Sequence, residues 1–254
     1  MMILDEIVGR TRERIEDLPE YRVSHGVEPG TVKSLLGAIH SKCRKNAIIA
    51  EIKYASPSAG LLRNYEDPAR LAGMMTRGGA TALSVLTEPF FFRGDPDNIR
   101  QVKATTDLPV LRKDFIIDKR QIYESRFLGA DAVLLIAGLL GDQLASFVEE
   151  CHRFSLEPLV EIHSADEVPA AAGSGARLIG INNRDLRTMK TCLKTTRLIA
   201  EKIRRDQITI VSESGIFWPC DIRYLSRYCD AYLVGSSLMR SSDPVKALEG
   251  LACA

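Results

Sequence analysis

The sequence predicts an α/β fold, a closed (β/α)8 TIM barrel preceded by an N-terminal helical extension. Three observations favour this fold: the length of 254 residues, an internal repeat of apolar segments, and helix signals between those segments. Chains of about 250 residues often form a single barrel of this kind. We expect residues 1–45 to form the extension and residues 46–254 to form one barrel, with no second barrel fused to it.

The internal repeat supplies half of the predicted strands. Its four copies, the last one weaker, are 79–86, 129–136, 175–182 and 228–234, with offsets of 50, 46 and 53 residues. An offset of this size holds about two strand–helix units. The other apolar runs lie between the copies, at 47–53, 108–113, 157–162 and 207–213. Together these segments predict eight strands that alternate with helices, which favours a parallel sheet.

Helix signals occupy the gaps between the strands. Apolar residues between Leu144 and Cys151 recur with helical spacing. No Gly-x-Gly-x-x-Gly follows the first strand, which disfavours a dinucleotide-binding fold. The predicted helix starts are N-cap acceptors, a capping box and first-turn prolines: Asp67-Pro68, Asp95-Pro96, Ser164 with Glu167, and Pro219.

The extension contains two sets of apolar residues with helical spacing among charges, from Ile3 to Leu18 and from Leu35 to Ile39. Two interpretations remain open. The helices plug the bottom or flank of the barrel, or they reach its rim and help to close a site.

Composition narrows the classes of partner. The chain has 45% apolar and 26% charged residues and a net charge of +1, which favours neither nucleic acid nor a membrane as a partner. It starts without a signal peptide, and the apolar stretch 132–140 is far shorter than the roughly 20 residues of a membrane helix. The six cysteines form no Cys-x-x-Cys pair. We expect a cytoplasmic protein with reduced thiols, as a monomer or a weak dimer.

The strongest functional signal is that predicted strands end in polar residues. Glu51 and Lys53 lie two residues apart, so they share a face of their strand, and Ile48, Ala50 and Ile52 share the other. If the apolar set faces the helices, both charges point into the barrel, where an unpaired charge costs several kcal/mol. Other strands end in the same way, with Lys113, Glu161, Asn182 and Glu213. We expect one shared site at the C-terminal ends of the strands.

The carboxylates predict the protonation state of the lysines. A carboxylate at 4 Å is worth roughly 4 kcal/mol at an effective dielectric constant of 20, so Lys53 and Lys113 should stay charged. A charged lysine is a general acid and not a Schiff-base nucleophile.

The last two strands indicate a phosphate site. Ser214-Gly215 and Gly235-Ser236-Ser237 follow these strands, where barrels often bind phosphate through backbone N–H groups. The long loop 54–63 suits a movable lid, in which Ser56 could donate to an anion. Phe90 to Phe92 and Phe115 offer an aromatic wall, although we expect one or two of them to belong to the core. We expect a solvated or structural role for His163, and no metal.

Segments along the whole barrel, from about residue 46 to 245, resemble the indole-3-glycerol phosphate synthase family. The N-terminal segment is similar only in length and helical character. Two departures are Tyr54, where the family usually has a basic residue, and a bulky 89–93 loop. The similar segments are Glu51–Ser58, Leu83–Glu88, Pro109–Ile117, Gln121–Tyr123, Leu159–Glu161, Gly180–Leu186, Val211–Ile216 and Leu233–Ser236.

The resemblance implies a carboxy-lyase of tryptophan biosynthesis that acts without a cofactor. Its substrate would be 1-(o-carboxyphenylamino)-1-deoxyribulose 5-phosphate, which the enzyme closes, decarboxylates and dehydrates. The resemblance implies these site residues: Lys113 as the acid, Glu161 as the base, Glu51 and Lys53 as partners or second acid, and Asn182, Glu213 and Ser214 as orienting groups.

The resemblance also implies how the substrate is held. The implied binding residues are Lys53, Gly215, Gly235 and Ser236 for phosphate, Phe92, Phe115 and Leu186 for the aromatic ring, and Ser56 and Arg184 for the carboxylate.

Two other functions remain as alternatives: a phosphosugar isomerase or Schiff-base aldolase on the same barrel, and a phosphate-ligand binder without catalysis.

Overall fold

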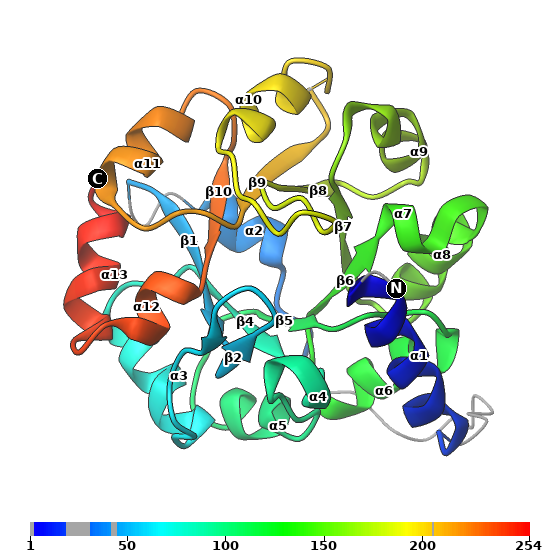
Figure 1. Cartoon of the computed structure of the whole chain (residues 1–254), viewed down its shortest axis with the longest axis horizontal. Coiled ribbons are helices and arrows are strands. Elements are labelled where there is room, and N and C mark those ends of the chain that lie inside the picture. Colours follow the sequence, from blue (N-terminus) through cyan, green and yellow to red (C-terminus); the bar gives the residue numbers. More distant parts are fainter. Residues whose placement is uncertain (1–2, 19–30, 42–44, 205) are drawn as a thin grey trace.

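The fold is a closed barrel of eight parallel strands, seen from one end in Figure 1. A computed structural model describes residues 3–18, 31–41, 45–204 and 206–254. The barrel strands are β1 (Ala47–Ile52), β4 (Ala82–Leu86), β5 (Val110–Lys113), β6 (Ala132–Ile136), β7 (Glu157–Ile162), β8 (Leu178–Asn182), β9 (Thr209–Glu213) and β10 (Ala231–Val234). Their order around the barrel is β1-β10-β9-β8-β7-β6-β5-β4, and β4 pairs with β1 to close it. Each strand overlaps one predicted segment, so the predicted fold class is confirmed.

Helices form a ring around these strands (Figure 1). The α-helices are α1 (Ile3–Glu16), α2 (Leu35–His40), α3 (Pro68–Arg77), α4 (Pro89–Phe92), α5 (Asn98–Lys103), α6 (Lys119–Leu128), α7 (Ala137–Leu140), α8 (Leu144–Arg153), α9 (Val168–Gly173), α10 (Lys194–Ala200), α11 (Pro219–Leu225), α12 (Ser236–Arg240) and α13 (Pro244–Ala252). The described residues also form the 3-10 helices η1 (Gly141–Gln143) and η2 (Ala165–Glu167). A short antiparallel hairpin, β2 (Ala55–Ser56) and β3 (Gly60–Leu61), lies within the loop predicted as a lid.

Three of the four predicted helix starts are confirmed. Asp67 caps α3, Ser164 and Glu167 form a capping box at η2, and Pro219 opens α11. The prediction at Asp95 is wrong, because α5 begins later, at Asn98. The Asp95 carboxylate instead accepts from the backbone N–H of Asp97 at 2.9 Å and stabilises the turn before the helix.

The side chains of the strands alternate between two apolar layers. Ile48, Ala50 and Ile52 belong to the layer between strands and helices, as predicted. Ile49 belongs to the layer inside the barrel, together with residues such as Leu111 and Val211. Glu51 is the next inward-facing residue of β1 and is 2% exposed. The barrel interior therefore changes from apolar to charged at the C-terminal ends of the strands.

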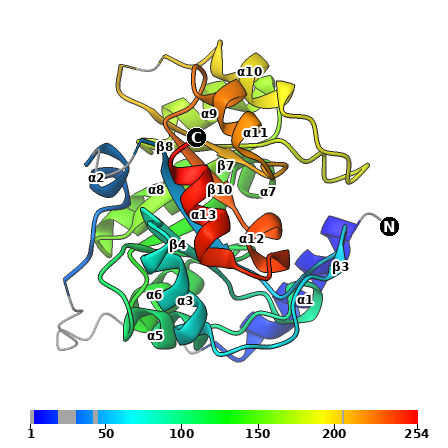
Figure 2. The same cartoon turned by 90° about the vertical axis from the view of Figure 1, so that its left-hand side faces the viewer.

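The two helices of the extension lie at opposite ends of the barrel (Figure 2). Leu35 and Ile39 of α2 pack into the interior layer and close the bottom, where the Glu157 carboxylate accepts from the Leu36 N–H at 2.8 Å. Helix α1 lies at the other end, and its Arg14 binds the Asp114 carboxylate just after β5. Both interpretations made from the sequence thus hold, each for one helix. The boundary at residues 45 and 46 stays a prediction.

Two findings concern the described residues only. Within them, no helix is long and apolar enough to cross a membrane. The five cysteines at positions 151, 192, 220, 229 and 253 are not in disulfides, and the sixth, Cys43, lies outside the described part of the chain.

Candidate active site

A pocket opens at the C-terminal ends of the strands, with an empty volume of about 1050 Å³ including its open mouth. Pockets of this kind can hold a small molecule. All eight barrel strands, or the residues directly after them, contribute to its wall. The wall includes every residue that the family resemblance implied for catalysis or binding: Glu51, Lys53, Ser56, Phe92, Lys113, Phe115, Glu161, Asn182, Arg184, Leu186, Glu213, Ser214, Gly215, Gly235 and Ser236. Their roles in the pocket remain predictions.

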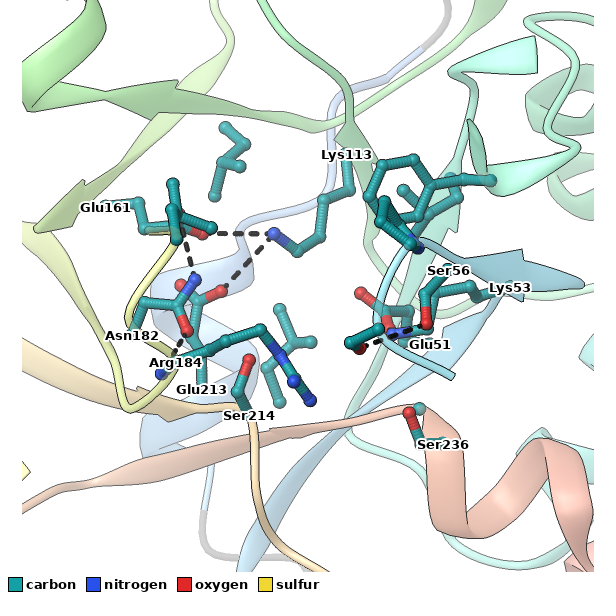
Figure 3. A pocket seen from close by; sticks show the side chains of 18 of the residues that line it. Glu51, Lys53, Ser56, Lys113, Glu161, Asn182, Arg184, Glu213, Ser214 and Ser236 are labelled. Carbon is teal, nitrogen blue, oxygen red and sulfur yellow. Dashed lines mark hydrogen bonds and ion pairs between the residues drawn. The ribbon is translucent and has the colours of Figure 1, made fainter. Parts of the chain in front are cut away.

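Lys113 lies in the middle of one cluster of charged groups (Figure 3). Its Nζ lies 3.0 Å from Glu161 Oε2 and 3.5 Å from Glu213 Oε2. Asn182 Nδ2 donates to Glu161 Oε1 at 3.1 Å and fixes the orientation of that carboxylate. Gly180 of β8 makes room for the third group, because a Cβ there would lie 2.0 Å from Glu213 Oε1. The strand ends therefore hold one ammonium group between two carboxyl groups.

The surroundings set different protonation states for these groups. Burial alone would lower the pKa of Lys113, but Glu161, Glu213 and Glu51 outweigh it and raise that pKa, so the lysine stays charged as predicted. Burial would raise the pKa of Glu161, but Lys113, His163 and Asn182 hold it well below its usual range. Burial and the neighbouring Glu161 raise the pKa of Glu213 well above its usual range. The two carboxyl groups beside Lys113 thus have pKa values shifted in opposite directions, and Glu213 is the one that holds a proton more readily.

A second charged pair lies on another side of the pocket, where Lys53 binds the Glu51 carboxylate (Figure 3). Both side chains come from the end of β1 and point inward, as predicted. Gly235, which follows β10, is essential to this arrangement, because a Cβ there would lie 2.2 Å from Glu51 Oε2. From the sequence, this glycine was expected to let backbone approach an anion, and the structure adds that it leaves space for a carboxylate.

Two turns after β9 and β10 form the remaining polar wall. Ser214 and Gly215 both have left-handed backbone conformations, with φ of 66° and 81°. A Cβ at Gly215 would also lie 2.3 Å from Thr191 Cγ2, so a larger residue would be strained and crowded. Ser236 begins α12 after the second turn and faces the pocket. Turns of this kind direct backbone N–H groups toward a bound anion.

The apolar wall is narrower than predicted. Phe92 and Phe115 line the pocket with ring centroids 6.0 Å apart. Phe90 and Phe91 are on α4 but do not line the pocket, and Phe90 is 54% exposed. None of the four rings is fully buried, but Phe115 is partly buried and packs against the apolar layer inside the barrel, so the expected core role holds for this one ring in part. Tyr54 also points away, because its hydroxyl donates to the Glu66 carbonyl at 2.6 Å.

Comparison with known proteins assigns the chain to a family. The family model described as indole-3-glycerol phosphate synthase matches residues 4–251. The chain belongs to the indole-3-glycerol phosphate synthase family. Relatives bearing that family's name are 42% identical in Carboxydothermus hydrogenoformans, over 98% of this chain and 99% of theirs, and 44% identical in Legionella pneumophila, over 98% of both. A relative from Caldanaerobacter subterraneus is 44% identical over 95% of both chains.

Solved structures of more distant proteins share the fold of this family member. A 3-hexulose-6-phosphate synthase superposes with a TM-score of 0.63 at 16% identity, covering 82% of this chain and 100% of that one. A thiamine phosphate pyrophosphorylase from Pyrococcus furiosus superposes with a TM-score of 0.59 at 18% identity, covering 81% and 93%. At such low identity the likeness concerns the barrel alone.

Some pocket residues were not predicted individually. Ile3, Leu4 and Ile7 of α1 form part of the wall, and only their helical spacing could have indicated it. His163, for which a solvated or structural role was expected, lies with Nε2 3.2 Å from Glu161 Oε1. The available signal was its position two residues after Glu161. Among the described residues, no cluster of histidine, cysteine or carboxylate groups could hold a metal ion.

Proposed function

We propose that this protein converts 1-(o-carboxyphenylamino)-1-deoxyribulose 5-phosphate to indole-3-glycerol phosphate, CO2 and water, a step of tryptophan biosynthesis that needs no cofactor. The observation that carries the proposal is the charged Lys113, 3.0 Å from Glu161 in the mouth of a barrel that matches the family over residues 4–251. The substrate is phosphorylated and carries a carboxylate, an aromatic ring and a ketone. The pocket contains groups suited to each.

The phosphate binds at the turns after β9 and β10, where Lys53, Gly215, Gly235 and Ser236 line the pocket. The aromatic ring packs between Phe92, Phe115 and Leu186, which supply the apolar part of the wall. Ser56 and Arg184 bind the carboxylate. The Arg184 guanidinium is already oriented, because its Nη1 donates to the Met189 carbonyl at 2.8 Å.

In the first step, the ring carbon that bears the carboxylate attacks the ketone carbon. A carbon–carbon bond forms, the carbonyl electron pair moves to oxygen, and Lys113 Nζ gives that oxygen a proton. The bond to the carboxylate then breaks, CO2 leaves, and its electron pair restores the aromatic ring. Lys113 suits this role because its surroundings keep it protonated and buried beside the substrate.

In the second step, the new hydroxyl leaves as water with a proton from an acid. Glu161 removes a proton from the new five-membered ring, and the indole double bond forms. Glu51 and Lys53 act as partners or second acid at this stage, and Asn182, Glu213 and Ser214 orient the reacting groups. Each positioned acid or base contributes about 10²- to 10⁴-fold to the rate.

The proposal is tested by supplying the substrate and following the fluorescence of the indole product together with release of CO2. Lys113→Met should retain the fold and lose activity about 10³-fold, as expected for loss of a general acid. Folded wild-type protein that gives neither product would refute the proposal. An aldolase would instead be trapped by borohydride through a lysine, and a binder would retain ligand affinity in Lys113→Met without ever releasing CO2.

We also propose that the protein acts as a monomer, or at most a weak dimer, in the cytoplasm. Each barrel holds the whole pocket within one chain, so catalysis requires no second subunit. Sedimentation of the active protein, measured at its assay concentration, tests this point.

A further inference from the structure

His163 is a partly exposed residue beside the buried carboxylate of Glu161. Its Nε2 lies 3.2 Å from Glu161 Oε1, and its side chain is 19% exposed, against 3% for that of Glu161. The nitrogen itself is buried and makes no hydrogen bond of good geometry, so the contact is electrostatic. Nothing in the proposed reaction has used this histidine so far.

The Glu161 carboxylate has nitrogen neighbours at both oxygens. Lys113 lies 3.0 Å from Oε2, whereas Asn182 at 3.1 Å and His163 at 3.2 Å are close to Oε1. Only the lysine and the histidine among these can carry a positive charge. The charge state of Glu161 therefore depends on these two cations.

The proposed reaction removes one of the two cations during each turnover. When Lys113 gives its proton to the ketone oxygen it becomes neutral. Glu161 would then be a buried carboxylate beside a neutral amine and the Asn182 amide, and burial would favour its protonation. A protonated Glu161 cannot serve as the base of the second step. A cation close to Oε1 prevents this loss.

We propose that His163 is a positioning residue whose imidazolium keeps Glu161 ionised while Lys113 is neutral. This inference rests on the proposed function and deepens it, because it assigns a further residue to the same site. His163 does not line the substrate pocket and acts only through Glu161.

The charges around His163 favour its protonated form. Glu161 lies on the same strand, and Glu167 of η2 accepts from the His163 backbone N–H at 2.6 Å. Lys113 of β5 opposes the positive charge. Burial lowers the pKa of His163, but Glu161 and Glu167 outweigh burial and the lysine, so the pKa is raised. The imidazolium therefore persists to a higher pH than that of an ordinary histidine.

The ion pair is tested without substrate by NMR titration of the four histidines. The His163 signal is assigned by its absence from His163→Asn. In Glu161→Gln the titration of this signal should move to lower pH, because the neighbouring negative charge is gone. An unchanged His163 titration in Glu161→Gln would overturn the inference, whether or not the protein proves to be a synthase.

The effect on catalysis is tested with His163→Asn, and with His152→Asn on the exposed surface of α8 as the matched control. We expect kcat of His163→Asn to fall about tenfold, the effect of one pKa unit on the ionised fraction of Glu161, with KM unchanged. Wild-type kcat should decline as pH rises through the His163 titration, and His163→Asn should lack this decline. A variant profile equal to the wild-type profile, or scaled by a constant factor at every pH, would assign His163 a purely structural role and refute the inference.

Discussion

Removal of the Arg14 guanidinium should loosen α1 from the rim of the barrel. Arg14 Nη2 lies 2.9 Å from both oxygens of Asp114, and its Nη1 donates to the Thr87 carbonyl at 3.4 Å. Asp114 is fully buried but keeps Arg112 as a partner at 3.0 Å, so Arg14→Met does not leave that carboxylate unpaired. A hydrogen-bonded charged contact of this kind is worth about 2 kcal/mol. The ratio of docked to undocked α1 should therefore fall roughly 30-fold.

The loss should appear in substrate binding, because Ile3, Leu4 and Ile7 of the same helix form part of the pocket wall. We expect KM to rise more than kcat falls in the indole fluorescence assay, and backbone amides of α1 to exchange hydrogen faster. Arg12→Met is the matched control, since Arg12 is exposed on the same helix. If Arg14→Met and Arg12→Met show the same KM and the same exchange in α1, the contact between Arg14 and Asp114 does not hold the helix.

Two further predictions concern Gly235 beside Glu51 and the buried carboxylate of Asp114. Gly235→Ala should lower activity at least 10²-fold, because the added Cβ would lie 2.2 Å from Glu51 Oε2 and displace that carboxylate from Lys53. Gly250→Ala, with no atom within 4 Å of its Cβ, should leave activity unchanged. Burial raises the pKa of Asp114, but Arg112 and Arg14 outweigh it and lower this pKa from 3.8 to about 2. The ionised Asp114 carboxylate therefore stabilises the fold fully above pH 3.8, and this stabilisation is lost as pH falls through about 2. The free energy of unfolding, measured with denaturant, should be higher for wild type than for Asp114→Asn. That difference should shrink by about 2 kcal/mol between pH 3.8 and pH 2. A constant difference at every pH would contradict this assignment.

The barrel could be predicted from sequence because its signals are local and repeated. Eight apolar runs of strand length, separated by helix caps, are compatible with few folds other than this barrel. The i,i+2 spacing of Glu51 and Lys53 determines which face of their strand carries the charges. The same parity argument works at the ends of the other strands. The sequence therefore predicts that these charged residues meet at one end of the barrel.

What could not be predicted depends on contacts between distant segments. The link between Arg14 and Asp114 joins residues 100 positions apart, and no pattern in either segment indicates the other. Gly180 appears as an ordinary strand glycine, and Gly235 was expected only to let backbone approach an anion, yet each leaves space for a carboxylate from another strand. His163 was expected to be solvated or structural because a single histidine is usually uninformative. The structure adds the distance of 3.2 Å between its Nε2 and Glu161 Oε1, on which the proposed role depends.

Helix α2 and the pocket lie at opposite ends of the barrel, and strand β9 has one residue in contact with each. Thr209 at the start of β9 contacts His40 of α2 at 2.8 Å, and Glu213 at its end lies 3.5 Å from Lys113. Four residue steps at roughly 3.3 Å place these two contacts about 13 Å apart along the strand. Directed evolution can therefore diversify the α2 end for heat tolerance and the mouth for new substrates in separate libraries, and the gains should combine additively.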